Sequence, residues 1–189
     1  MNAPTRLQTE PQRRLFTVDE VLSMQRAGVF EDDRKFELIE GELILTQSKL
    51  NRHELYKNHL TQAFYRLLPS EATAWVEPTL YLPPHNAPDP DIMVFPRGRS
   101  IEELKPEEVF LIVEVADTTL RTDLGAKASL YARFGVREYW VIDVRTPRLV
   151  VHRYPEGEGW KEIRSLTRTE CIAPLAFPSA SIRLADLDS

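Results

Sequence analysis

One apolar run constrains the fold of this chain more than any other segment. Residues Val109 to Val115 read Val-Phe-Leu-Ile-Val-Glu-Val, a stretch of strand length whose only charged residue is Glu114. A strand that is apolar at consecutive positions is typical of a central strand buried on both faces of a sheet. The sequence therefore predicts a central strand with a carboxylate buried near its end.

A second charged residue lies in an apolar pattern on the following segment. The apolar stripe of a helix predicted from about Arg121 to Phe134, closed by Gly135, contains Leu124, Lys127, Ala128, Tyr131 and Phe134 at three- and four-residue steps. Burying an ammonium group lowers the folding stability by several kcal/mol unless a negatively charged group lies next to it. Glu114 is a partner of the same kind, and Asp91 is another, because it opens the strand-like stretch 91–95.

The other segments alternate between helix and strand patterns. Thr17 to Ala27 and Asn51 to Leu68 are typical of helices, and Thr17 with Glu20 three residues later forms a capping-box pattern. Strand patterns cover Lys35 to Thr46 (a hairpin turning at Glu40-Gly41), Ala74 to Leu82, Asp91 to Phe95, Glu138 to Val144, Leu149 to Tyr154, Gly159 to Leu166 and Cys171 to Leu175. The order predicts an α/β or α+β fold: helix, three strands, helix and strand in a mixed sheet, after an N-terminal helix and hairpin and before a C-terminal β-meander.

Bulk composition limits the class of protein. With 189 residues, 42% of them hydrophobic and 28% charged, we expect a soluble single domain over residues 15–189 after a frayed tail at 1–14. No apolar run approaches the roughly 18 residues that span a bilayer. The single Cys171 indicates a reducing, cytoplasmic location. The net charge of −5 argues against a surface that binds nucleic acid throughout, but leaves room for a local basic groove.

The charged residues in the apolar patterns predict a metal-dependent phosphodiester hydrolase. The twelve-residue connection Arg97–Glu108 permits antiparallel pairing of the strands around it, which would make Asp91 and Glu114 neighbours. Two carboxylates, waters and a substrate phosphate are the usual ligands of Mg²⁺, with Mn²⁺ as an alternative, and the backbone carbonyl of Val115 can add a ligand. Lys127 can then orient or deprotonate the attacking water, or neutralise the pentacovalent phosphorus.

Three stretches carry a resemblance to a known family. The segments FELIEGEL at 36–43, Pro-Asp-Ile at 90–92 and the long segment from Val113 to Asp143 resemble the Uma-two family of bacterial restriction endonucleases, which belongs to the PD-(D/E)xK nuclease superfamily. The resemblance extends over about residues 16–186. It implies a restriction-endonuclease-like core, DNA as the partner, magnesium as the cofactor and a homodimer.

The resemblance also implies roles for individual residues. Asp91 matches the aspartate of the PD motif and Glu114 the acid of the (D/E)xK motif, both metal ligands. The superfamily places its lysine two residues after that acid, where this chain has Ala116. The family implies a lysine displaced onto the next helix, and Lys127 lies there, thirteen residues after Glu114. Glu37 matches an acid that the family places near the cleft.

Each of these residues also has a purely structural explanation. The stem of Lys127 could cross apolar surface with its amine in water, and Glu114 could form an ion pair with Arg121 or Lys127. Asp91 fits a loop-to-strand boundary, and Glu37 could be an exposed cross-strand partner.

Three functional hypotheses follow. The first is a magnesium-dependent DNA endonuclease. The second is a catalytically inactive nuclease-fold module that binds DNA or regulates, which the net charge and Ala116 favour. The third is an interaction protein related to mobile elements or toxins that acts as a dimer through exposed apolar strand edges within 149–175.

Overall fold

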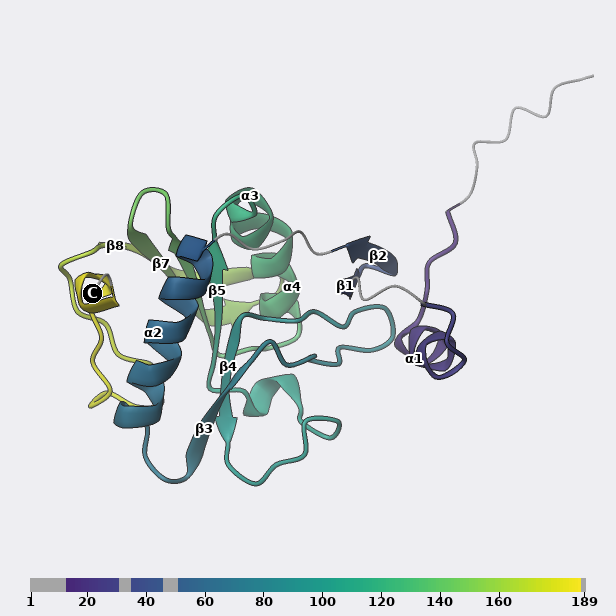
Figure 1. The fold of residues 1–189 in the computed structure, drawn as a ribbon, viewed down its shortest axis with the longest axis horizontal. Helices are drawn as coiled ribbons and strands as arrows, with labels where there is room; N and C mark the ends of the chain where they lie inside the picture. Colours follow the sequence, from purple (N-terminus) through teal and green to yellow (C-terminus); the bar gives the residue numbers. More distant parts are fainter. Residues whose placement is uncertain (1–12, 31–34, 46–50, 188–189) are drawn as a thin grey trace, which may run out of the picture.

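A computed structural model describes residues 13–30, 35–45 and 51–187 of the chain. Its centre is a six-stranded sheet in the order β3-β4-β5-β6-β7-β8, and a separate two-stranded sheet pairs β1 with β2 (Figure 1). The strands are β1 (Phe36–Ile39), β2 (Glu42–Leu45), β3 (Ala72–Val76), β4 (Ile92–Pro96), β5 (Leu111–Ala116), β6 (Glu138–Asp143), β7 (Arg148–Glu156) and β8 (Gly159–Thr167). The helical segments are α1 (Val18–Arg26), α2 (Asn51–Leu67), η1 (Pro106–Glu108), α3 (Leu120–Thr122), η2 (Asp123–Lys127), α4 (Ala128–Arg133) and η3 (Leu184–Leu187).

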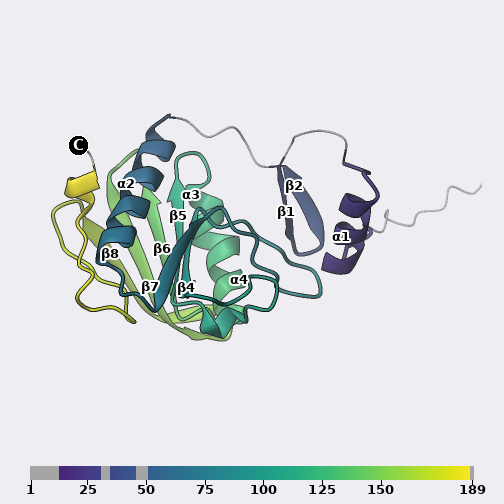
Figure 2. The same cartoon turned by 60° about the horizontal axis from the view of Figure 1, so that its bottom comes forward.

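Helices cover the central strands on both faces. Helix α2 packs Tyr56, Leu60 and Phe64 on one face, together with alternate residues of β4, β5 and β6. The continuous helix α3-η2-α4 covers the other face, as the turned view in Figure 2 shows, and packs Ala128 and Tyr131 there. Every residue of β5 is buried, because both of its faces are covered. The expectation of a central strand buried on both faces is confirmed.

The sheet is mixed, and the connections explain why. Strands β4 and β5 are antiparallel neighbours, whereas β5 and β6 run parallel because the helix α3-η2-α4 crosses between them. The core thus has the order α2, β3, β4, β5, α3-η2-α4, β6. Strands β6, β7 and β8 continue it as an antiparallel meander. The predicted fold class is confirmed.

The predicted strand at 74–82 is wrong in extent. Strand β3 begins at Ala72 and ends at Val76, and Glu77 then takes a positive φ of 50°. Pro78 follows and has no N–H for a sheet ladder, so regular pairing stops there. The chain from 77 to 90 instead forms an arm that folds back on itself. The predicted strand at 171–175 is also wrong, since only a single bridge pairs Ile172 with Ile182.

The arm at 77–90 holds the N-terminal elements against the core. Leu38 of β1 forms an antiparallel bridge with Ala87, and the N–H of Gly41 donates to the carbonyl of His85 at 2.8 Å. The hairpin turns at Glu40 and Gly41 as predicted, and both have positive φ values, of 50° and 77°. A Cβ on Gly41 would lie 2.6 Å from that of Leu15, so only glycine fits.

Of the remaining predictions, one is confirmed and the others are not tested by the described residues. The capping box at the start of α1 is confirmed, because Thr17 and Glu20 exchange side chain to backbone hydrogen bonds. Most of the predicted tail at 1–14 lies outside the described residues, and the assignment of 15–189 to one domain stays a prediction. No helix among the residues described here is long and apolar enough to cross a membrane.

Candidate active site

The register of β4 and β5 brings the two predicted metal ligands together. Ile92 pairs with Val113, so Asp91, which directly precedes β4, faces Glu114 across the antiparallel pair. The Asp91 carboxylate accepts a hydrogen bond from the backbone N–H of Val115 at 2.7 Å, measured to Oδ2. Asp91 and Glu114 are 3% and 4% exposed. Both carboxylates therefore sit at one buried end of the central strands.

The helix over this face delivers Lys127 to Glu114. Its middle turn, η2, is a π-helical turn that ends at Lys127. Such turns are rare and frequently occur at functional sites. Lys127 is 7% exposed, and its Nζ donates to Glu114 Oε1 at 3.0 Å and to Glu37 Oε1 at 2.8 Å. The lysine stem does not carry the amine to water, so that structural alternative is wrong.

Glu37 reaches the site from the N-terminal hairpin. It is 7% exposed, so it is not an exposed cross-strand partner. Besides the Lys127 ammonium, its Oε1 accepts the backbone N–H of Asp89 at 2.8 Å. The arm and the hairpin therefore meet the core at the same side chain.

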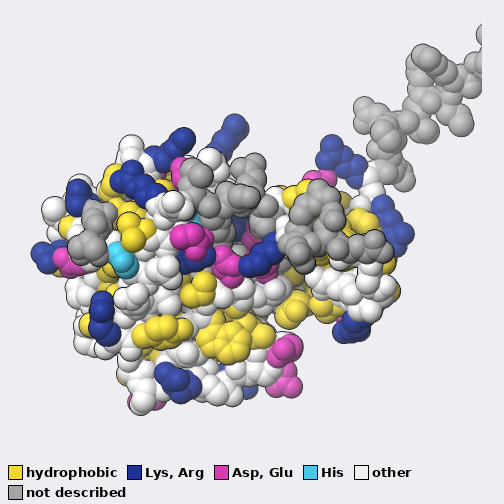
Figure 3. Space-filling model, viewed as in Figure 1, with side chains coloured by type: hydrophobic (Ala, Val, Ile, Leu, Met, Phe, Trp, Pro, Cys, Tyr) yellow, Lys and Arg dark blue, Asp and Glu magenta, His cyan; other side chains and the backbone are white. Residues whose placement is uncertain are grey.

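The cluster holds more negative than positive charge. Burial raises the pKa of Glu114 well above its usual range, Lys127 opposes this shift, and the charges of Asp91, Asp123 and Glu37 reinforce it. Burial alone would lower the pKa of Lys127, but the carboxylates of Glu114, Glu37 and Asp123 raise it, so this residue is an ammonium ion at neutral pH. In Figure 3, acidic and basic side chains gather in the middle of the visible face, between α2 and the hairpin.

The residues present suit a hard divalent cation. Within the described parts of the chain, no three His, Cys, Asp or Glu side chains form a ready-made metal cluster. Mg²⁺ does not need one, because it commonly binds one or two carboxylates and keeps waters and substrate phosphate as its other ligands. Asp91 and Glu114 supply oxygen ligands at a place where a cation would offset the burial and the neighbouring negative charges that raise the Glu114 pKa.

Four further residues of this cluster were not among the predicted site residues. Asp123 is buried and accepts a hydrogen bond from the Thr119 hydroxyl. The hydroxyl of Tyr131 donates a hydrogen bond to Glu114 Oε1 at 3.1 Å. The other two are Asp89 and His53, which contacts Asp91. His53 carries a signal in the sequence, because it continues the apolar stripe of α2, as Lys127 does on its own helix.

Comparisons with known proteins agree with this architecture. The chain matches the family Uma2, described as "Putative restriction endonuclease", over residues 18–185. The chain belongs to this family. The family assignment supports a nuclease and confirms the resemblance seen in the sequence.

A solved structure shows the same fold. It is the crystal structure of a protein from Anabaena variabilis titled a "putative nuclease belonging to DUF820". It superposes with a TM-score of 0.73 at 20% identity and covers 91% of this Uma2 chain and 97% of its own. A search of curated proteins finds none that matches the chain.

Proposed function

We propose that this Uma2 protein is a divalent-metal-dependent DNA endonuclease that hydrolyses phosphodiester bonds. The observation that carries the proposal is the buried contact of Lys127 with Glu114 and Glu37, beside Asp91. Two carboxylates and a lysine are the groups that PD-(D/E)xK nucleases use. Here the lysine that contacts the acid comes from the helix. The position two residues after the acid, where the superfamily has its lysine, is occupied by Ala116 and is buried in the core.

Asp91 and Glu114 would hold Mg²⁺ or Mn²⁺, with the Val115 carbonyl as a further ligand. The bound ion would lower the pKa of a water and stabilise charge that develops on the phosphate. The protein contributes the ordering of this site. The backbone N–H of Val115 fixes one oxygen of Asp91, and the hydroxyl of Tyr131 fixes one oxygen of Glu114.

Lys127 acts in this proposal as a cation rather than as a base. Its neighbouring carboxylates keep it protonated, and an ammonium group has donors but no lone pair with which to take a proton. It can still orient the attacking water through a hydrogen bond and stabilise the negative charge of the transition state. Glu37 shares the ammonium with Glu114 and so supports its position.

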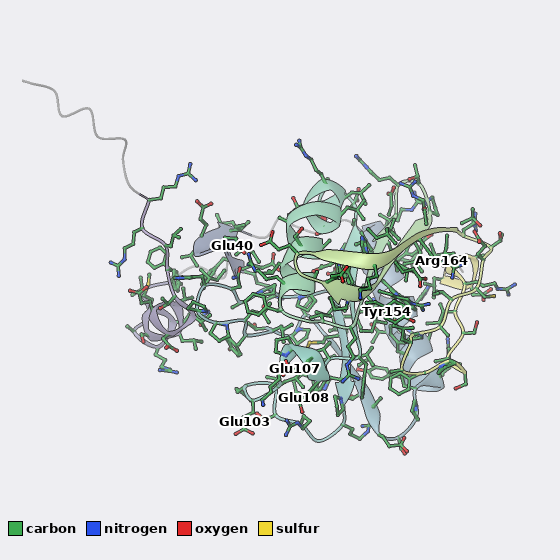
Figure 4. The ribbon with its side chains drawn as sticks, turned by 180° about the vertical axis from the view of Figure 1, so that it is seen from behind. Glu40, Glu103, Glu107, Glu108, Tyr154 and Arg164 are labelled. Atoms are coloured by element: carbon green, nitrogen blue, oxygen red, sulfur yellow. The ribbon has the colours of Figure 1, made fainter. Side chains whose placement is uncertain are left out.

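The net negative charge of the chain is compatible with DNA binding at this place. Glu103, Glu107 and Glu108 lie on the segment between β4 and β5, close together in the lower left part of Figure 4. Asp91 precedes β4 and Glu114 is near the end of β5, so the site is at the other end of these strands. Part of the acidic charge is thus remote from the proposed DNA contact. The homodimer and the cytoplasmic location stay predictions.

A cleavage assay on supercoiled plasmid, with Mg²⁺, Mn²⁺ or a chelator, tests the proposal. We expect divalent-dependent cutting that Asp91→Asn and Glu114→Gln abolish, and that Asp186→Asn, a surface substitution, leaves intact. Circular dichroism would establish that each variant is folded. Unchanged cutting by folded Asp91→Asn would reject the assignment. DNA binding without cutting in any divalent ion would favour the alternative, an inactive nuclease-fold module that binds DNA or regulates.

A further inference from the structure

A histidine on α2 contacts the carboxylate that the proposed function assigns to the metal. His53 is 5% exposed, and its Nε2 lies 3.0 Å from Asp91 Oδ2. An ionised carboxylate only accepts hydrogen bonds, so Nε2–H of the imidazole is the donor. The same oxygen accepts the backbone N–H of Val115 at 2.7 Å. Two donors from different elements, α2 and β5, therefore fix the orientation of the Asp91 carboxylate.

His53 is itself held in place by a series of polar contacts. Its Nδ1 lies 3.3 Å from Oε1 of Glu54, a contact that is a hydrogen bond when both ring nitrogens carry a proton. The same Glu54 oxygen accepts a hydrogen bond from the Lys57 ammonium at 2.8 Å. Lys57 is only 5% exposed and also donates to Glu77 Oε1 at 2.7 Å. The backbone N–H of Glu77 then donates to the carbonyl of Asp91 at 3.1 Å. The contacts form a closed ring that begins and ends at Asp91.

This ring of contacts does more than supply hydrogen-bond partners for the buried imidazole of His53. It joins α2 to the end of β3 and to the start of β4, and it constrains both the side chain and the backbone of Asp91. An apolar residue at position 53 would continue the helix stripe without burying any polar group, at a lower desolvation cost. Partners that hydrogen-bond a metal ligand are known to set the affinity for the metal, since they hold the ligand in its binding orientation.

We infer that His53 is a positioning residue that holds the Asp91 carboxylate ready for a divalent cation. The inference rests on the proposed function, since Asp91 needs this orientation only if it binds a metal. His53 does not act on the substrate in this role. Its effect should appear as a change in metal affinity and not merely as a loss of folding.

Calorimetric titration of the full chain with Mn²⁺, in the absence of DNA, tests the inference. We expect His53→Leu to raise the Mn²⁺ dissociation constant about tenfold, in the range known for partners of metal ligands. His53→Gln should recover most of the affinity, because the glutamine amide can donate from a position close to that of Nε2. The matched control is His59→Leu on the same helix, where the histidine Nδ1 lies 2.7 Å from the carbonyl of Leu187. It should leave Mn²⁺ affinity unchanged.

The titration separates the inference from the proposed function. If the wild type binds Mn²⁺ and Asp91→Asn does not, but His53→Leu binds as tightly as the wild type, the positioning role is overturned and the metal site stands. If the wild type and Asp91→Asn both fail to bind Mn²⁺, the metal site fails and the role of His53 fails with it. A lower melting temperature of His53→Leu with unchanged Mn²⁺ affinity would assign the histidine to folding alone and overturn the inference.

Discussion

The ammonium of Lys127 lies 3.0 Å from a carboxylate oxygen of Glu114, and both side chains are buried. The helix that carries the lysine and the strand that carries the acid meet because the chain crosses over the sheet between β5 and β6. Desolvation of the two charges opposes folding, so the pair persists only because each charge has partners. Such an arrangement is weak support for stability and stronger support for function, since perturbed buried charges cluster at functional sites.

Removal of the ammonium should destabilise the protein strongly. Lys127→Met keeps much of the side-chain volume but leaves Glu114 and Glu37 without their cation. We expect a loss of about 3–5 kcal/mol in the free energy of unfolding, the usual cost of an uncompensated buried charge. Urea denaturation at pH 8 measures it. The double variant with Glu114→Gln should lose less than the sum of the two single losses, because no unpaired charge then faces the lost lysine.

Lys161→Met is the matched control for this loss. Lys161 pairs with Glu156 at 3.2 Å on the surface, with 59% of its side chain exposed, so its removal should cost under about 1 kcal/mol. Equal effects of Lys127→Met and Lys161→Met would contradict the buried ion pair.

The hydroxyl of Tyr131 should contribute through Glu114. Tyr131→Phe removes the donor at 3.1 Å from Oε1 while it keeps the ring in the core. Removing one partner of a buried hydrogen bond costs about 1–3 kcal/mol, and we expect a loss of this size in urea denaturation. Tyr65→Phe is the control, since Tyr65 is 64% exposed and its substitution should change stability by under about 0.5 kcal/mol. A Tyr131→Phe variant as stable as the wild type would show that the hydroxyl does not stabilise the acid.

The sequence predicted those site residues that are charged at positions where the surrounding pattern is apolar. Glu114 interrupts an apolar strand and Lys127 an apolar helix stripe, so both could be found from periodicity. The antiparallel pairing that makes Asp91 their neighbour followed from a connection of moderate length. The core order of helices and strands was predictable for the same reason, because most of its buried segments have strong periodicity.

The remaining parts depend on tertiary contacts that leave no such signal. Glu37 reaches Lys127 because the arm at 77–90 docks the hairpin, and only residues 77–82 of that arm were predicted, as the end of a strand. Its path depends on the bridge between Leu38 and Ala87, which are distant in sequence. Tyr131 and His53 do lie on buried helix stripes, but their hydrogen-bond partners depend on which strand end lies beside each helix. Sequence patterns specify which face of a helix or strand is buried, but not which atoms of the neighbouring element that face contacts.

A buried acid outside the candidate site should be important for stability alone. Glu138 is fully buried on the face away from Lys127 and accepts hydrogen bonds from Arg153 at 2.7 Å, Trp140 at 2.8 Å and the backbone N–H of Leu175 at 2.6 Å. Glu138→Ala should therefore cost about 3–5 kcal/mol, since Arg153 loses its partner. The segment after β8 should also loosen, which limited trypsin digestion at Arg183 would detect.

Glu158→Ala serves as its control. The side chain of Glu158 is 69% exposed and lies 3.5 Å from Arg133, so its loss should cost under about 1 kcal/mol. If Glu138→Ala is no less stable than Glu158→Ala, the network around Glu138 does not hold the C-terminal segment.

Asp123 should make stability depend on pH in an unusual direction. Burial raises the pKa of Asp123 to about 6, although Lys127 and the Thr119 hydroxyl oppose the shift. Because the folded pKa exceeds the unfolded one, the ionised group costs stability. That cost develops as pH rises between about 3.9 and the folded pKa, and it is complete above that range. Asp123→Asn should therefore gain up to about 3 kcal/mol over the wild type at pH 8, and nothing below pH 4, since one pKa unit corresponds to about 1.4 kcal/mol.

Asp143→Asn provides the opposite case for the same measurement. Burial alone would raise the pKa of Asp143, but hydrogen bonds from Thr146 and from the backbone N–H of Arg145 lower it overall. Its ionised form therefore stabilises the fold above about pH 4, the unfolded value, and this contribution is lost as pH falls through the folded pKa. Urea denaturation from pH 4 to 8 should thus show a widening gain for Asp123→Asn and a loss for Asp143→Asn. Parallel pH profiles for the two variants would contradict the buried, destabilising charge assigned to Asp123.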